Sequence, residues 1–268
     1  MPDAPRDPAP AWAELSTGVW MTTVEPDTVN VGLVAGSRGC LLVDCGSSPE
    51  QGAALAAAAT AVTDRPLLAV VLTHGHLDHV GGLAGLDGLG SGPVESIGHE
   101  SLTTGSVTLS RPIALATVVD LGDRRVEIAH LGAGHTPGDL LIVVPDADLV
   151  FAGDLVESAG PPWFGADSSP AEWPASLDGL IGLLGEHSTV VPGHGPVMRR
   201  EDVFGQRSEL AAVSGELRAL AETGVPLSEA AARGHWPYPV AHIVQGLAAG
   251  YAEVLPSGAV SGRRLPLV

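Results

Sequence analysis

The chain has 268 residues, of which 45% are hydrophobic, so it is long enough to bury a sizeable core. It carries 31 acidic and 13 basic residues, a net charge of −18, and every basic residue is arginine. Such a charge repels nucleic acid. No apolar run approaches the roughly eighteen residues that a membrane span needs, and the first residues do not resemble a signal peptide. We therefore expect a cytoplasmic protein with no nucleic-acid or membrane partner.

The first third of the chain predicts strands on either side of one helix. Residues 1–13 are rich in proline and are expected to be disordered, which leaves 14–268 as a single domain. A helix is expected from Ser48, which can cap it, with Pro49 at the first helical position. The expected strands are Val19–Val24, Val29–Ala35, Cys40–Asp44 and the continuous apolar run Leu67–Thr73.

The rest of the chain returns to strands and then becomes helical. Apolar stripes with helical spacing run over 177–184 and 210–220, and 238–255 reads as a last helix, so C-terminal helices are expected over about 199–255. This order of elements predicts an α/β layered fold, with mixed sheets covered by helices. The further expected strands are Arg125–Ala129, Leu140–Val144 and Leu149–Ala152.

A cluster of polar side chains follows the buried strand in AVVLTHGHLDHVGG (69–82). Alternate residues of an extended chain point the same way, so His74 and His76 can project together beyond the strand end. Asp78 and His79 follow where the chain turns. Four side chains that can bind a metal ion thus converge from one loop, and further ligands are expected at other strand ends.

Three such residues occur later in the chain, each near a glycine and next to a predicted strand. His135 lies in AHLGAGHTPGDL between two strands, Asp154 ends the strand in LVFAGDLVE, and His194 follows the strand in TVVPGHGPV. In layered α/β folds, the ends of strands are where sites are built.

Taken in order, HGHLDH (74–79), GHTPGD (134–139), FAGD (151–154) and PGHG (192–195) resemble the metallo-β-lactamase superfamily over roughly residues 18–198. The resemblance implies an αββα sandwich, two mixed sheets packed face to face with helices outside. It also implies a pair of divalent metal ions. Zn²⁺ suits imidazole and carboxylate ligands, although Fe or Mn also bind such sites. By the resemblance, one ion is held by His74, His76 and His135, the second by Asp78, His79 and His194, and Asp154 bridges them.

Departures within the family narrow the expected activity. His76 stands where a glutamate would suggest the redox di-iron branch. Asp154 resembles the glyoxalase II and lactonase branches rather than the best-known zinc β-lactamases, which have cysteine there. No long insertion separates Asp154 from His194, which disfavours the branch that cuts nucleic acids.

Two metal ions that lie roughly 3.5–4 Å apart can share one water molecule and lower its pKa to about 7. No serine or cysteine nucleophile is then required. Asp78 is the candidate catalytic residue, expected to orient that water and to move a proton. Ligating imidazoles need a partner for their other ring nitrogen. Asp44 is the first candidate for that role, and Thr73 and His130 are weaker ones.

The long segment 157–173 follows Asp154 directly and carries three aromatic side chains. Trp163, Phe164 and Trp173 could line an apolar wall of a substrate pocket, and His242 could contact the substrate from the last helix. Simple packing of a long loop is the alternative interpretation for the three aromatic residues.

The sequence therefore predicts a dinuclear metal-dependent hydrolase that cleaves a small-molecule ester, thioester, lactone or amide. A β-lactamase-type amide hydrolase is one alternative. An iron-dependent oxidoreductase on the same fold, such as a sulfur dioxygenase, is another. A non-enzymatic binding protein is disfavoured because all seven ligands are intact. Homo-oligomers are compatible with the sequence, which does not identify the substrate.

Overall fold

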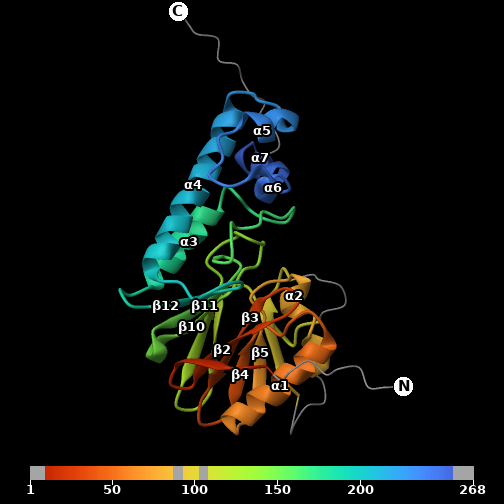
Figure 1. Ribbon diagram of the computed structural model, residues 1–268, viewed down its shortest axis with the longest axis vertical. Helices are drawn as coiled ribbons and strands as arrows, with labels where there is room; N and C mark the ends of the chain where they lie inside the picture. The colour runs from red at the N-terminus through yellow and green to blue at the C-terminus, as the bar shows by residue number, and fades with distance from the viewer. Residues whose placement is uncertain (1–9, 87–92, 103–107, 256–268) are drawn as a thin grey trace, which may run out of the picture.

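The computed structural model describes residues 10–86, 93–102 and 108–255. Within these ranges the strands form one seven-stranded and one five-stranded sheet (Figure 1). The larger sheet has its strands in sequence order, antiparallel from β1 to β4 and parallel from β4 to β7. Its strands are β1 (Ala13–Ser16), β2 (Val19–Val24), β3 (Val29–Ala35), β4 (Cys40–Val43), β5 (Leu67–Val71), β6 (Glu95–His99) and β7 (Arg111–Ile113).

The smaller sheet has the order β12-β11-β10-β9-β8, and only β11 and β12 run parallel to each other. Its strands are β8 (Ala116–Asp120), β9 (Arg125–Ala129), β10 (Leu141–Val144), β11 (Leu149–Gly153) and β12 (Thr189–Pro192). The helices are α1 (Pro49–Thr63), α2 (Leu77–Val80), α3 (Trp173–Leu183), α4 (Arg200–Glu222), α5 (Leu227–Arg233), α6 (Val240–Ile243) and α7 (Leu247–Val254).

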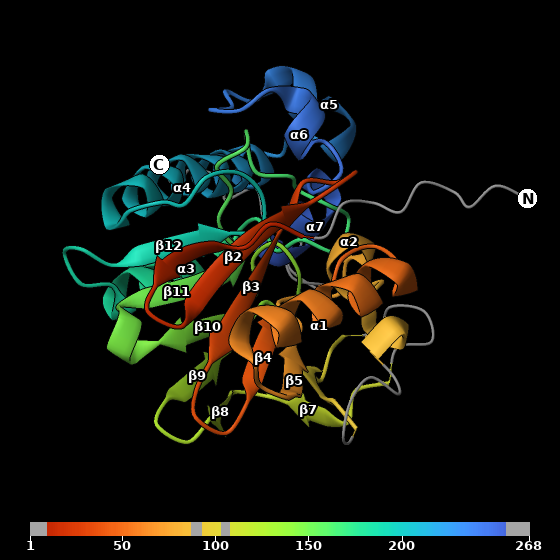
Figure 2. The same ribbon diagram turned by 60° about the horizontal axis from the view of Figure 1, so that its bottom comes forward.

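Three apolar layers hold these elements together. Side chains from both sheets meet in a central layer that includes Val43, Ile142 and Phe151. A second layer joins the larger sheet to α1, and a third joins the smaller sheet to α3, α4 and the C-terminal helices. Figure 2 shows α1 on the outside of the larger sheet and α3 and α4 on the outside of the smaller one. The predicted αββα sandwich is therefore confirmed.

The predicted ends of several elements were wrong. Residues 1–9 of the expected disordered segment lie outside the described residues, but Trp12 packs against the core and Ala13 begins β1. β4 stops at Val43 because Asp44 adopts a left-handed backbone, with φ of 63°. The expected last helix is two helices, α6 and α7, which are separated by 244–246.

Four strands were not predicted at all. β1 lies at the end of the proline-rich start, and β6 contains Gly98 and ends in a histidine. β7 is three residues long with a proline in the middle, and β8 is largely exposed. Each is too short or too polar to show the sustained apolar pattern that marks a strand in a sequence. Among the described residues, no helix combines the length and the hydropathy of a transmembrane segment.

Candidate metal centre

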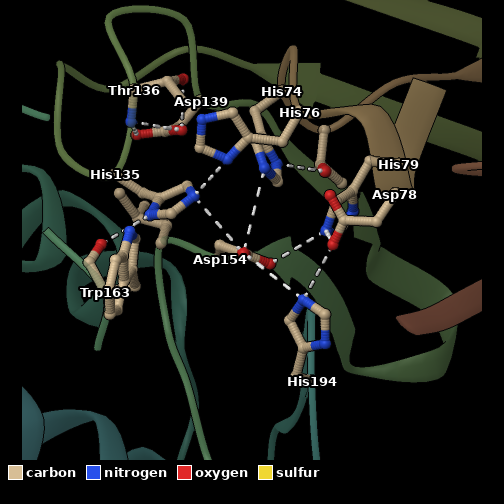
Figure 3. A network of polar contacts seen from close by, with 12 residues as sticks. His74, His76, Asp78, His79, His135, Thr136, Asp139, Asp154, Trp163 and His194 are labelled. Carbon is tan, nitrogen blue, oxygen red and sulfur yellow. Dashed lines mark hydrogen bonds and ion pairs between the residues drawn. The ribbon is translucent and has the colours of Figure 1, made fainter. Parts of the chain in front are cut away.

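The structure brings all seven predicted metal ligands to one place, although they come from four separate segments (Figure 3). His74 and His76 lie in the loop after β5, and Asp78 and His79 lie on the short helix α2. His135 lies in the loop between β9 and β10. The remaining two, Asp154 and His194, follow the parallel strands β11 and β12 of the smaller sheet.

The ligand atoms fall into two groups, and within each group they lie within 4.8 Å of one another. The first group is His74, His76, His135 and Asp154, and the second is Asp78, His79 and His194. Asp154 also reaches the second group. Its Oδ1 is 3.2 Å from His79 Nε2, while its Oδ2 is 3.4 Å from His135 Nε2 and 3.5 Å from His194 Nε2. This carboxylate thus lies between the two groups, where a bridging ligand would have to be.

Asp44 and Thr73 orient two of the imidazoles from behind. The Asp44 carboxylate accepts from the Thr73 N–H at 2.7 Å and from the Thr73 hydroxyl at 2.8 Å. It also accepts from His79 Nδ1 at 2.8 Å. The Thr73 hydroxyl has given its only proton to Asp44, so at 3.0 Å from His74 Nδ1 it can only accept. Both imidazoles therefore carry their proton on Nδ1 and turn the lone pair of Nε2 into the site.

The other three imidazoles are fixed by similar contacts. His135 Nδ1 is 3.2 Å from the carbonyl of Trp163, and His194 Nδ1 is 3.0 Å from the carbonyl of Asp27. A carbonyl oxygen only accepts, so each Nδ1 must donate. His76 is reversed, since its Nε2 is 3.1 Å from the Asp167 carboxylate and its Nδ1 faces the site. All five rings can thus present a lone pair inward, as metal ligands must.

Unpaired atoms at the centre provide a test of whether these residues suit metal ions. His74 Nε2, His79 Nε2 and Asp154 Oδ1 are buried and make no hydrogen bond within the described part of the chain. Buried polar atoms without a partner are costly and uncommon in folded proteins. Two divalent cations would satisfy these atoms, so the arrangement fits the pair of ions that the sequence predicts.

Burial and the neighbouring charges shift the pKa values of the acids and imidazoles in the site. Burial alone would raise the pKa of the Asp154 carboxyl, but His79, His74 and His135 hold it well below its usual range. Burial lowers the pKa of His135 to about 4. The hydrogen bond to Asp167 raises the pKa of His76. The carboxylate between the two ligand groups is therefore ionised at neutral pH, as a cation-binding site requires.

His130 does not orient a predicted ligand, contrary to the prediction from the sequence. Its Nδ1 is 3.0 Å from the backbone carbonyl of Asp139, and its ring packs against His99 with 4.2 Å between ring centroids. Asp139 accepts in turn from the Thr136 N–H and hydroxyl. The contact between His130 and Asp139 thus stabilises the loop that carries His135, but His130 does not touch the imidazole of His135.

A cavity of ≈ 420 Å³ opens over the predicted ligands, and only one of the four predicted pocket residues lines it. Trp163 lines the cavity and is 45% exposed. Phe164 and Trp173 are fully buried in the apolar core, so the structure supports packing for these two. His242 packs against the Trp163 ring, with centroids 5.7 Å apart, but it is not part of the lining.

Several residues that shape the site were not found from the sequence. Asn30 in β3 donates to the carbonyls of Pro192 and Gly195 and so holds the loop that carries His194. A side chain at Gly193 would collide with the Asp154 carboxylate, which explains the glycine before His194. Asn30 is a polar residue in an apolar strand, which is a signal that could have found it. Asp27, the partner of His194, and Asp167, the partner of His76, lie in polar segments and carry no such signal.

Glu157 is a further cavity residue that was not predicted. Burial raises its pKa to about 7, and the nearby Asp154 carboxylate acts in the same direction. It lies three positions after Asp154, at the start of the long segment that precedes α3. An acidic residue so close to a predicted ligand is a signal that the sequence does contain.

A family pattern and several known proteins are similar to this chain. The pattern of the metallo-beta-lactamase superfamily matches residues 24–194. A metallo-beta-lactamase type 2 from Bacillus cereus is 31% identical over 137 residues, which is 48% of this chain and 52% of that protein. An acyl-coenzyme A thioesterase from Gallus gallus is 28% identical over 200 residues, 62% of this chain and 72% of the relative. A hydroxyacylglutathione hydrolase from Dechloromonas aromatica is 32% identical over 117 residues, 44% of this chain and 41% of the relative.

The chain thus spans about half the length of the Bacillus relatives. Among solved structures, the metallo-beta-lactamase from Erythrobacter litoralis superimposes with a TM-score of 0.67 at 24% identity, covering 78% of this chain and 99% of that one. The superposition shows the same fold. With the family pattern matched over most of the chain and the ligand residues gathered in two groups, the protein belongs to the metallo-beta-lactamase superfamily.

Proposed function

We propose that the protein is a dinuclear metal-dependent hydrolase of a small-molecule ester, thioester, lactone or amide. The observation that carries the proposal is the inward lone pair available on all five imidazoles, together with the Asp154 carboxylate that lies between the two ligand groups. The similar proteins named above include a thioesterase and a hydroxyacylglutathione hydrolase, which support a carbonyl substrate.

In this proposal one ion would be held by His74, His76 and His135, the other by Asp78, His79 and His194, and Asp154 would be a ligand of both. Zn²⁺ is the expected metal because the ligands are imidazoles and carboxylates. When bound, the pair of ions supplies a hydroxide at neutral pH and polarises the carbonyl. In the reaction, water adds to the carbonyl carbon, the bond to the leaving oxygen, sulfur or nitrogen breaks, and an acid and the protonated leaving group result.

The chain's own side chains position the reaction. Asp78 Oδ2 lies 3.4 Å from His79 Nε2 and 3.3 Å from His194 Nε2, and the side chain is 25% exposed. It borders the cavity, so it can orient a water molecule there by accepting a hydrogen bond from it. Burial alone would raise the pKa of this carboxyl, but His194 and His79 hold it well below its usual range, so it is a weak base that can only pass a proton on. Asp44 fixes the orientation of His79 directly and that of His74 through the Thr73 hydroxyl.

The test is a substrate panel with purified, zinc-loaded protein. Thioesters, lactones, β-lactams and phosphoesters are assayed before and after removal of the metal with a chelator and after zinc is restored. We expect turnover of at least one carbonyl class, its loss on chelation and its recovery with zinc. A coloured, redox-active iron centre in protein purified without added metal, with no hydrolysis of the panel, would instead support the oxidoreductase.

A further inference from the structure

The cavity over the predicted metal site is lined by no arginine or lysine among the described residues. Besides the predicted ligands, its lining consists of Thr28, Glu157, Ala159, Gly160, Pro161 and Trp163. The first two arginines after β12 make other contacts: Arg199 donates to the His187 carbonyl and to the Thr189 hydroxyl, and Arg200 lies over the ring of Phe204. A substrate carboxylate or phosphate would find no arginine or lysine partner in this lining.

Glu157 is held firmly at the wall of the cavity. Its Oε1 accepts from the Ala159 N–H at 2.7 Å. Its own N–H donates to Gln206 Oε1 at 2.9 Å, and Gln206 is a buried residue of α4 whose Nε2 donates to the Leu155 carbonyl. The carboxylate therefore has a fixed place and borders a cavity that a small molecule can enter.

Trp163 lines the same cavity from the other end of the 157–163 loop. Its carbonyl faces His135 Nδ1, and its ring packs edge-on against His242, so both ends of the residue are supported. An exposed tryptophan face attracts organic cations, and tryptophan binds them best of the aromatic side chains. The net charge of −18 adds a long-range field that also attracts cations.

We propose that the substrate carries a protonated amine or quaternary ammonium group, which Glu157 and Trp163 bind beside the reacting carbonyl. The inference rests on the proposed hydrolase and names the class of its substrate. Burial raises the pKa of Glu157 to about 7, and a cation bound beside it favours the ionised carboxylate, which supplies the opposite charge. The indole supplies a cation-binding face, and a cavity of ≈ 420 Å³ accommodates a small molecule. Anionic substrates of equal size are disfavoured at the same position.

The experiment compares three thioesters that differ chiefly in the charge of the leaving thiol. Acetylthiocholine is cationic, S-(3,3-dimethylbutyl) thioacetate is its neutral isostere, and S-acetyl-3-mercaptopropionate is anionic. We expect kcat/KM of the zinc-loaded protein to favour the cation over the neutral isostere by about tenfold, as for a partly exposed ion pair with aromatic support. Glu157→Gln should abolish most of this ratio, and Glu157→Lys should reverse it in favour of the anion. Glu127→Gln, at an exposed position of β9 outside the cavity, should keep it.

Binding of the three free thiols to the same proteins gives a readout that does not depend on turnover. The same order of affinity is expected, with the same response to the Glu157 variants. Binding that follows this order, in a protein that hydrolyses neither these thioesters nor any member of the wider substrate panel, would overturn the proposed hydrolase and support the cation site. Equal binding and turnover of all three would overturn the cation site and leave the hydrolase standing. A uniform loss of kcat in Glu157→Gln, with the ratio kept, would also overturn it, since Glu157 would then act on the reaction itself.

Discussion

The floor of the cavity and its wall are built in different ways. The floor is the group of seven predicted ligands, five of which line the cavity, and side-chain and carbonyl contacts fix every imidazole in it. The wall, residues 157–163, belongs to a long loop between β11 and α3, and Trp163 in it is nearly half exposed. The floor can thus determine the class of chemistry while the wall selects the substrate, and changes in the two regions should have separable effects.

Replacement of Asp154 should have the largest effect. Asp154→Ala removes the carboxylate that contacts both ligand groups, so the protein should lose bound metal and lose activity by roughly 10³-fold or more. Metal content by elemental analysis and kcat/KM measure the two losses, and circular dichroism checks that the fold survives. Full turnover in this variant would show that the catalytic metal site lies elsewhere in the protein. Asp64→Asn, at the left-handed cap of α1, serves as the control.

Trp173→Ala tests where the wall ends and the core begins. Trp173 is fully buried, packs against Phe164 and donates from Nε1 to the Leu155 carbonyl. Its loss should lower the free energy of unfolding by about 3–5 kcal/mol, measured by urea denaturation. Trp163→Ala in the same segment should cost less than about 1 kcal/mol. Equal costs would contradict the distinction between these two tryptophans.

Asp44→Asn tests the support behind the floor. Asparagine tolerates the left-handed backbone at this position, but it has a single accepting oxygen, whereas the carboxylate uses both of its oxygens to hold Thr73 and His79. We expect zinc affinity to fall by about 10–100-fold, measured by competition with a chelator. Asp167→Asn is the comparison, because Asp167 is half exposed and supports His76 alone, and its effect should be smaller. Equal losses would show that burial of the supporting carboxylate does not matter.

Zinc binding should depend on pH in a direction set by the imidazoles. Burial lowers the pKa of His194, but Asp154 and Asp78 outweigh it and raise that pKa to about 10, and Asp167 raises the pKa of His76. His194 is therefore protonated at neutral pH before metal binds, and the imidazole must lose this proton before it can bind the ion. Zinc affinity should rise by up to about tenfold per pH unit for each proton released. Calorimetric titrations in two buffers of different ionisation enthalpy detect the protons, and identical heats would contradict the prediction.

Trp163→Ala should have the smallest effect on the floor and a selective effect on the wall. We expect relative kcat/KM values across the ester and lactone panel to change by roughly several-fold, while metal content stays the same. An unchanged profile would show that the wall does not contact the substrate. A parallel loss of metal would show that the two regions are coupled through the Trp163 carbonyl, which faces His135.

The floor could be predicted from the sequence because its residues lie in short motifs at the ends of strands. Asp44 and Thr73 followed from the chemistry that ligating imidazoles require. The wall could be predicted only in part: Trp163 lines the cavity as expected, but the burial of a loop side chain depends on how distant helices pack on the loop. Trp163 and Phe164 are adjacent in sequence yet have opposite environments, because the Phe164 N–H is tied to the carbonyl of His242 on α6 and its ring is turned into the core.

The side chain of Asn30 joins parts of the chain that are 162 positions apart, and the loop that it holds carries His194. Contacts over such separations form slowly, because the intervening chain must first be ordered. The second ligand group is therefore expected to be completed late in folding, after both sheets have docked. The first ligand group also takes residues from both sheets, so metal uptake by a refolding chain would report the moment at which the two halves of the molecule have met.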